Sequence, residues 1–269
     1  MPRKLVNGAE LYYEIHGDGE PIVMIMGLSA NIDWWTPEFL EELERRYKTI
    51  LFDNRDAGRS DNVEKKYQIE DLAKDTIKLM DQLDIDRAHI LGISMGGMVA
   101  QEIALNYPER VKKLVLASTN LGNPKSILPS GKVLNMLMKD REGRSNEEII
   151  DEFISLLFAN DFIDENPEFI KKTKKRMMKA PIKPDAYQRQ LNAILKFKTG
   201  RRLKGLNIPT LVIHGKKDIL LPPENGEIIA DLIPNANLKL FEGAGHSLFS
   251  HIPKKTSKTI IEYLENHNN

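Results

Sequence analysis

The chain has 269 residues, a length typical of one large domain with or without an inserted subdomain. Its 39 basic and 39 acidic residues cancel, so the net charge gives no reason to expect nucleic acid or an anionic membrane as a partner. The absence of cysteine excludes disulfides, thiolate metal sites and a cysteine nucleophile. No signal-peptide pattern follows Met1, and the longest apolar stretch, Ile22 to Ala30, is far shorter than the about 20 residues of a membrane span. We therefore expect a cytoplasmic protein that contacts no membrane.

Short apolar runs rich in β-branched and aromatic residues recur along the chain and predict strands. Several of these runs are continuously apolar, which is typical of strands buried on both faces of a parallel sheet. The predicted strands cover residues 11–15, 22–26, 49–52, 88–91, 114–117, 210–213 and 238–241.

Helical patterns lie between these strands. Residues 69–84 and 95–107 carry apolar side chains at steps of three and four, and a last helix is expected over about 254–265. Alternation of strand and helix predicts an α/β fold, with a mostly parallel central sheet and helices on both of its faces.

The alternation stops between about residues 121 and 200, where no strand pattern is found. Ser145 and Glu148 have the spacing of a capping box and predict a helix over 145–158. We expect residues 1–120 and 201–269 to form the core and residues 121–200 to form an all-helical insertion. The basic residues between 171 and 204 favour a solvated helix face, although attraction of an anionic substrate stays an alternative.

The most informative motif is Gly92–Gly96, a G-x-S-x-G sequence directly after a predicted strand and directly before a predicted helix. In this setting the motif predicts a nucleophile elbow, a tight turn that exposes the hydroxyl of Ser94. Glycines flank the serine because a Cβ at either position would crowd the turn. The Met95 N–H is left free at a helix N-terminus, where it can bind an oxyanion. The alternative is a glycine-rich turn with an incidental serine.

A serine nucleophile needs a neighbouring base. His246 follows the last predicted strand, and the glycines before it let a loop carry the imidazole to the next strand end, so we expect it to be the general base. Asp218, in the loop after the preceding strand, is expected to accept a hydrogen bond from the imidazole and fix its tautomer, unless it only forms a turn. The remaining histidines are in settings that fit a base less well: His16, His89, His214, His251 and His267.

The loop Met26–Ala30 follows a buried strand and is expected to supply a second oxyanion donor, the N–H of Leu28. Trp34 and Trp35 come soon afterwards, and one is expected to pack while the other lines the acyl pocket. We assign substrate contacts to Leu28, Trp35 and Met95. The charged loop Asp53–Ser60 is interpreted as holding its own backbone rather than a ligand.

These motifs together resemble the α/β-hydrolase superfamily along essentially the whole chain. The most similar branch contains carboxylesterases, 3-oxoadipate enol-lactone hydrolases and aclacinomycin methylesterases. The likeness is carried by Met26–Ala30 with the two tryptophans, Asp53–Ser60, Gly92–Gln101 and the loops of Asp218 and His246.

This resemblance implies an α/β-hydrolase fold whose helical insertion covers the site as a cap. It places the nucleophile, acid and base on Ser94, Asp218 and His246. It places the oxyanion donors on Leu28 and Met95. Met26 stands where many relatives have histidine, which leaves the backbone donor in place.

The expected activity is hydrolysis of carboxylic esters or lactones with small to medium acyl groups, without a metal or an organic cofactor. The partner is then a small-molecule substrate, and the chain is a monomer or a homodimer. Alternatives on the same residues are a cofactor-free perhydrolase (haloperoxidase), a carbon–carbon bond hydrolase, or a ligand receptor derived from a hydrolase.

Overall fold

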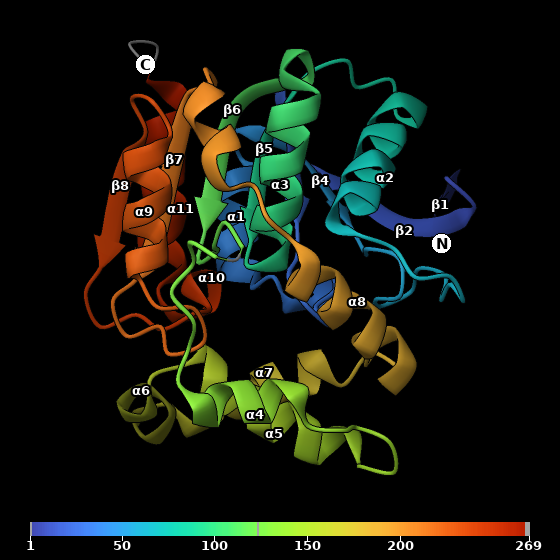
Figure 1. The fold of residues 1–269 in the computed structure, drawn as a ribbon, viewed down its shortest axis with the longest axis vertical. Helices are drawn as coiled ribbons and strands as arrows, with labels where there is room; N and C mark the ends of the chain where they lie inside the picture. Colours follow the sequence, from blue (N-terminus) through green and yellow to red (C-terminus); the bar gives the residue numbers. More distant parts are fainter. Residues whose placement is uncertain (1, 123, 267–269) are drawn as a thin grey trace.

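The computed structural model describes residues 2–122 and 124–266, whose strands form one sheet in the order β1-β2-β4-β3-β5-β6-β7-β8 (Figure 1). β2 pairs in antiparallel fashion with β1 and with β4, and the pairs among β3 to β8 are parallel. This confirms the predicted, mostly parallel sheet. The strands are β1 (Arg3–Val6), β2 (Ala9–His16), β3 (Glu20–Ile25), β4 (Tyr47–Phe52), β5 (Ala88–Ile93), β6 (Val111–Ala117), β7 (Thr210–Gly215) and β8 (Asn237–Phe241).

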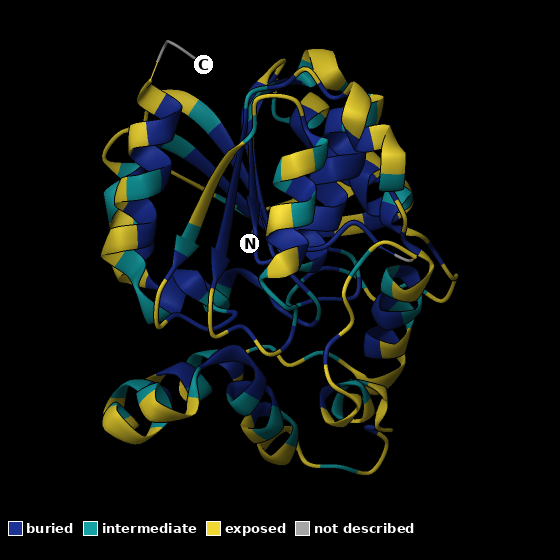
Figure 2. Ribbon diagram, turned by 60° about the vertical axis from the view of Figure 1, so that its left-hand side comes forward, coloured by how far each residue is buried: buried dark blue, intermediate teal, exposed yellow. Residues whose placement is uncertain are grey.

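Alternate residues of the central strands enter two different cores. Val23 and Ile25 of β3 face a core formed with α2 (Ile69–Gln82), α3 (Met95–Asn106) and α9 (Glu224–Leu232). Ile22 and Met24 face a second core, formed with the helices α1 (Pro37–Glu44), α10 (Leu248–His251) and α11 (Pro253–Glu265). Figure 2 shows the buried strands between helices whose outer faces are exposed. Burial of both sheet faces explains the continuously apolar runs.

The predicted helices are found with boundaries shifted by only one or two residues. α2, α3 and α11 match the expected segments. The helix α5 (Asn146–Leu157) opens with the predicted capping box, in which Ser145 and Glu148 bind each other's backbone N–H groups. Among the described residues, no helix is both long enough and apolar enough to cross a membrane.

The sequence prediction missed β1, the short edge strand at the N-terminus. β1 and β2 form a hairpin through Asn7 and Gly8, whose φ angles are 44° and 82°. Asn-Gly is the strongest short-range hairpin signal, because both residues tolerate positive φ. The charged residues in Arg3–Val6 interrupt the apolar pattern of this strand, but the Asn-Gly turn after it is a signal from which the strand could have been predicted.

A run of helices separates β6 from β7, as the sequence predicted for this segment. Phe153, Leu157 and Tyr187 belong to a third hydrophobic cluster, against which Leu28 and Trp34 of the sheet side also pack. Figure 1 shows α4 to α7 at the end of the sheet toward which the parallel strands point. The helices are α4 (Gly131–Met138), α5, α6 (Asn160–Glu165), α7 (Pro167–Met177) and α8 (Pro184–Lys196), and short 3-10 helices occur at η1 (Ile32–Trp34), η2 (Pro108–Arg110) and η3 (Gly200–Gly205).

Several basic residues of the 171–204 stretch form ion pairs with acidic groups. Lys174 Nζ lies 2.6 Å from an oxygen of Asp151, in the acidic part of the same helical segment. Arg202 lies 2.8 Å from the buried Glu102 of α3. The stretch is therefore partly neutralised within the chain.

Candidate active site

Ser94 lies at the junction of β5 and α3 in a strained backbone conformation. Its φ of 56° and ψ of −120° lie outside the main allowed regions for a side-chain-bearing residue. A Cβ on Gly92 would lie 2.1 Å from the carbonyl oxygen of Gly96, and a Cβ on Gly96 would lie 2.1 Å from the carbonyl oxygen of Ile25. Both flanking glycines are thus sterically required, as the motif predicts.

His246 and Asp218 are brought together by two neighbouring loops. His246 Nδ1 lies 2.7 Å from Asp218 Oδ2, and both side chains are buried. The loops approach closely after β7 and β8, because a Cβ on Gly215 would lie only 2.3 Å from the carbonyl oxygen of Gly245. The contact orients the imidazole, and among the described residues its Nε2 has no hydrogen-bond partner.

The Asp218 carboxylate accepts hydrogen bonds on both oxygens. The backbone N–H groups of Leu220 and Leu221 each donate to Oδ1 over 2.9 Å. His214 Nε2 lies 3.1 Å from Oδ2 and 2.9 Å from the Leu221 carbonyl oxygen; since a carbonyl only accepts, this nitrogen carries a proton. Burial alone would raise the pKa of Asp218, but the charge and hydrogen bonds of His246 and His214 outweigh it and hold the pKa below its usual range.

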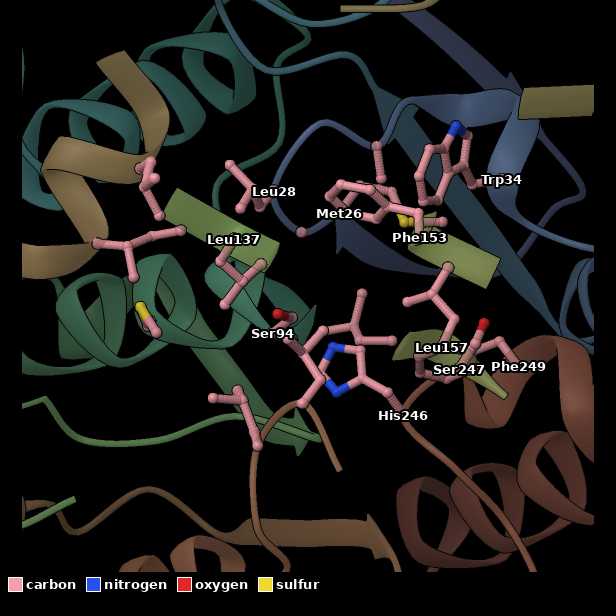
Figure 3. Close-up of a pocket in the computed structure, with 18 residues that line it drawn as sticks. Met26, Leu28, Trp34, Ser94, Leu137, Phe153, Leu157, His246, Ser247 and Phe249 are labelled. Atoms are coloured by element: carbon pink, nitrogen blue, oxygen red, sulfur yellow. The ribbon is translucent and has the colours of Figure 1, made fainter. Parts of the chain in front are cut away.

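Ser94 and His246 line the same cavity, and Figure 3 shows the serine hydroxyl beside the imidazole ring. The hydrogen bonds of the described residues join His246 to Asp218 but do not join it to Ser94. In unliganded active sites such a contact is often long and tightens when substrate binds.

The loop after β3 lies directly against the serine. A Cβ on Gly27 would lie 3.0 Å from Ser94 Cβ and 3.4 Å from Ser94 Oγ. Leu28 lines the cavity, as predicted. Met95 is the first residue of α3, so its N–H has no acceptor within the helix. The Met95 side chain is fully buried in the core and is not among the cavity walls, so a side-chain contact with substrate is ruled out and the predicted contact of Met95 is left to its backbone N–H.

The cavity has a volume of about 100 Å³ and mostly apolar walls. Ser94, His246 and Ser247 are the lining residues with a hydroxyl or ionisable side chain. The sheet side and the helical segment both contribute, and the apolar walls include Met26, Leu28, Trp34, Ile93, Met98, Leu137, Phe153, Leu157, Leu191 and Ile194. An uncharged apolar group of a ligand fits these walls, because it has no polar atom of its own that would need a hydrogen-bond partner there.

The assignment of Trp35 to the pocket is wrong. Its ring is 2% exposed and packs between Phe39 and Phe249, with ring centroids 5.7 and 4.8 Å away. Trp34 lines the cavity instead and meets Phe153 of α5 edge to face at 6.2 Å. Trp34 is the last residue of η1 and Trp35 is its C-cap, and the sequence gives no sign of which of the two faces the core.

The two tryptophans are expected to respond differently to truncation. Trp35→Ala should lower the free energy of unfolding by about 3–5 kcal/mol, because it leaves a void in a closed core. Trp34→Ala should cost much less stability but shift KM and acyl-length preference toward larger groups. Thermal melting together with kinetics on an ester series measures both effects. Equal losses of stability in the two variants would contradict the placement.

Of the described histidines, His246 alone lines the cavity. His89 is buried, and its Nε2 lies 3.0 Å from Glu20; burial lowers its pKa. This agrees with the prediction that it packs within a strand. His251 Nδ1 accepts a hydrogen bond of 3.1 Å from the N–H of Gly245, directly before His246, and thus supports that loop. His267 lies outside the described residues.

The Asp53–Ser60 loop holds its own backbone, as interpreted from the sequence. Asp53 is fully buried and accepts hydrogen bonds from the N–H groups of Ile32 and Arg59 over 2.7 and 2.8 Å. Burial raises the pKa of Asp53 to about 6 despite these donors. No group of three or more side chains suited to a metal is found within residues 2–122 and 124–266.

Comparison with known proteins agrees with this geometry. The model of the alpha/beta hydrolase fold family matches residues 20–251. The chain belongs to this family. It is 25% identical to a putative carbamate hydrolase RutD of Azorhizobium caulinodans over 98% of each chain. It is 30% identical to a poly(3-hydroxyalkanoate) depolymerase of Ectopseudomonas oleovorans over 91% of this chain and 84% of that one.

A solved structure of a thermophilic esterase from Thermogutta terrifontis, with malate bound, superposes with a TM-score of 0.84 at 26% identity and covers 98% of each chain. The resemblance inferred from the motifs is therefore confirmed, and this alpha/beta hydrolase is an enzyme of the hydrolase class. The names of these relatives differ in the bond or polymer they mention, so family membership alone leaves the substrate open.

Proposed function

We propose that this hydrolase cleaves carboxylic esters or lactones through a catalytic triad of Ser94, His246 and Asp218. The observation that carries the proposal is His246, which contacts a buried carboxylate at 2.7 Å and lines the same cavity as the strained serine. This combination supplies a nucleophile and a base at one cavity, with an acid behind the base to orient it.

The reaction then follows in two steps. Ser94 Oγ adds to the ester carbonyl carbon as His246 Nε2 takes the hydroxyl proton, and the N–H groups of Leu28 and Met95 bind the carbonyl oxygen as it becomes negative. The carbon–oxygen bond to the alcohol breaks, and the alcohol takes the proton from His246. Water next loses a proton to His246 and adds to the acyl carbon. The bond between the acyl carbon and Ser94 Oγ then breaks, Oγ takes the proton back from His246, and the carboxylic acid is released.

The cavity walls favour an ester or lactone over a carbamate or ureido substrate. A carbamate carries a nitrogen with N–H groups that need acceptors once they are buried. The cavity offers no carboxylate or carboxamide side chain among its lining residues. An alkyl or aryl acyl group needs no such partner, so small to medium apolar acyl groups fit best.

The remaining organisation is part of the same proposal. Residues 121–200 act as a cap, since α5 and α8 contribute Phe153, Leu157 and Leu191 to the cavity walls. Residues 1–120 and 201–269 act as the catalytic core. The enzyme works in the cytoplasm, as a monomer or homodimer, on a small-molecule substrate.

Acyl-length dependence tests the substrate class. With p-nitrophenyl esters of increasing chain length, kcat/KM should rise from acetate to an optimum at short or medium acyl groups and fall beyond it, because the cavity is small, with a volume of about 100 Å³. Lactones of several ring sizes and an aryl carbamate extend the screen. A steady rise toward long-chain esters, or preference for the carbamate, would contradict the proposed substrate class.

A further inference from the structure

The side chain of Gln190, on α8, lies buried between two loops at the strand ends. It is 0% exposed. Its Oε1 accepts a hydrogen bond of 2.9 Å from the backbone N–H of Ser29, and its Nε2 donates one of 3.2 Å to the carbonyl oxygen of Arg55. Both polar atoms of this amide therefore contact backbone groups that come from the core, far away in sequence.

Ser29 needs this support because its backbone is strained. Its φ is 66°, in the left-handed region that favours glycine. The N–H of Ala30 donates to the carbonyl oxygen of Gly27 over 3.2 Å and closes a tight turn in which Ser29 is the third residue. Turns with positive φ at this position usually have glycine or asparagine there. The Ser29 hydroxyl is buried without a hydrogen-bond partner among the described residues, so it does not stabilise the turn.

The same turn orients the N–H of Leu28. The carbonyl of Gly27 and the N–H of Leu28 belong to one planar trans peptide, so they point in opposite directions. The carbonyl is directed toward Ala30 by the turn hydrogen bond, which directs the N–H to the other side. Gly27 is also the residue that packs on Ser94. Relaxation of Ser29 would open the turn and break the hydrogen bond between Ala30 and Gly27, which would leave the peptide that carries the Leu28 N–H free to rotate.

The helix that carries Gln190 is held firmly to the core. The adjacent Arg189 forms a bidentate pair with Asp56, with Nε and Nη2 lying 2.8 and 2.9 Å from the two carboxylate oxygens. Asp56 is buried and also accepts a hydrogen bond of 2.9 Å from Tyr67 Oη. The amide of Gln190 is thus fixed by its neighbour and by Arg55.

We propose that Gln190 is a positioning residue for the oxyanion hole. Through the N–H of Ser29 it keeps the turn closed and the Leu28 N–H aimed at the site of the developing oxyanion. α8 thus takes part in transition-state binding as well as forming a cavity wall. This inference rests on the proposed triad, which supplies the oxyanion.

Gln190→Met tests the inference, because methionine has a similar length but offers no acceptor to Ser29. We expect kcat on a short p-nitrophenyl ester to fall by about 10- to 100-fold with KM nearly unchanged, since complete loss of one oxyanion donor costs about 10²–10³. The rate of Ser94 labelling by a fluorophosphonate should fall in parallel, because the phosphonyl oxygen uses the same donors. Gln188→Met, at an exposed position of the same helix, is the matched control and should change neither rate.

A second substitution separates positioning from packing. Ser29→Gly accepts a positive φ without strain, so the double variant Ser29→Gly/Gln190→Met should regain most of the lost kcat. Gln190→Glu keeps an acceptor for Ser29, and at this buried position a protonated carboxyl can donate to the Arg55 carbonyl in place of Nε2. This variant should therefore retain most of the activity, which covers the case in which the methionine variant does not fold. Failure of rescue by Ser29→Gly, or equal losses in the Glu and Met variants, overturns the inference.

The labelling experiment also separates this inference from the proposed function. If wild-type Ser94 is labelled and Gln190→Met is labelled equally fast, the role of Gln190 is refuted while the nucleophile stands. If wild-type Ser94 is not labelled, the proposed triad fails, and the role of Gln190 fails with it.

Discussion

Ser94→Ala is expected to lower kcat on a short ester by about 10⁶-fold, close to the loss seen when a serine hydrolase loses its nucleophile. Alanine removes the oxygen that would form the acyl-enzyme and leaves His246 and Asp218 in contact with each other. Substrate should still bind, because the apolar walls that hold the acyl group do not change. Stopped assays with highly purified protein are needed to measure so small a residual rate.

Detection of a covalent acyl-enzyme would support the same assignment of Ser94 as the nucleophile. Wild-type protein quenched during turnover should carry the mass of the acyl group on the peptide containing Ser94, and Ser94→Ala should carry none. Ser247→Ala is the control, because Ser247 also lines the cavity but lies on the loop after His246. Undiminished turnover in Ser94→Ala, or acylation of Ser247 instead, would refute the assignment.

Asp218→Asn is expected to lower kcat by about 10⁴-fold, because an amide NH2 in place of the carboxylate favours the wrong tautomer of His246. Asp218 receives hydrogen bonds from Leu220, Leu221 and His214 as well as from His246. An amide has one acceptor oxygen, so the substitution also leaves some of these donors without an acceptor and should lower the thermal melting temperature.

The pH dependence of stability provides a further check on Asp218. Since the folded chain holds its pKa below the usual range, ionised Asp218 stabilises the fold at neutral pH, and this contribution is lost as the pH falls through that lowered pKa. The stability difference between wild type and Asp218→Asn should therefore shrink in strong acid.

Glu102→Gln is a control for Asp218→Asn, because Glu102 is a buried carboxylate that pairs with Arg202 outside the cavity. It should lower stability and leave kcat unchanged. If Asp218→Asn keeps full activity while losing stability to the same extent, Asp218 has only a structural role.

Features with a local cause could be predicted from the sequence. The two glycines around Ser94 are required by contacts within the turn and with the adjacent strand, so the motif itself predicted the elbow. Asp218 and His246 follow two strands that are neighbours in the sheet, and the rule that parallel strands end at one edge was enough to predict that they meet. Apolar runs likewise predicted the buried strands.

Features that depend on contacts between distant segments could not be predicted in this way. Trp34 and Trp35 are identical residues in succession, and only the packing of Phe39 and Phe249 against one of them decides which is buried. The contact between Gln190 and Ser29 joins residues 161 positions apart, and no sequence pattern in either segment predicts it. From the sequence, His214 is only a histidine that fits the base less well, because its hydrogen bond to Asp218 depends on the path of the loop between them.

The cavity wall is formed by residues from two parts of the chain, the loops at the strand ends and the helices inserted between β6 and β7. The proposed reacting groups, Ser94 and His246, lie on loops at the strand ends, whereas Phe153, Leu157 and Leu191 come from helices inserted between two strands. Substitutions on those helices would change the substrate preference without displacing Ser94 or His246. Laboratory evolution toward a new substrate should therefore accumulate its first mutations in α5 and α8, but spare Gln190.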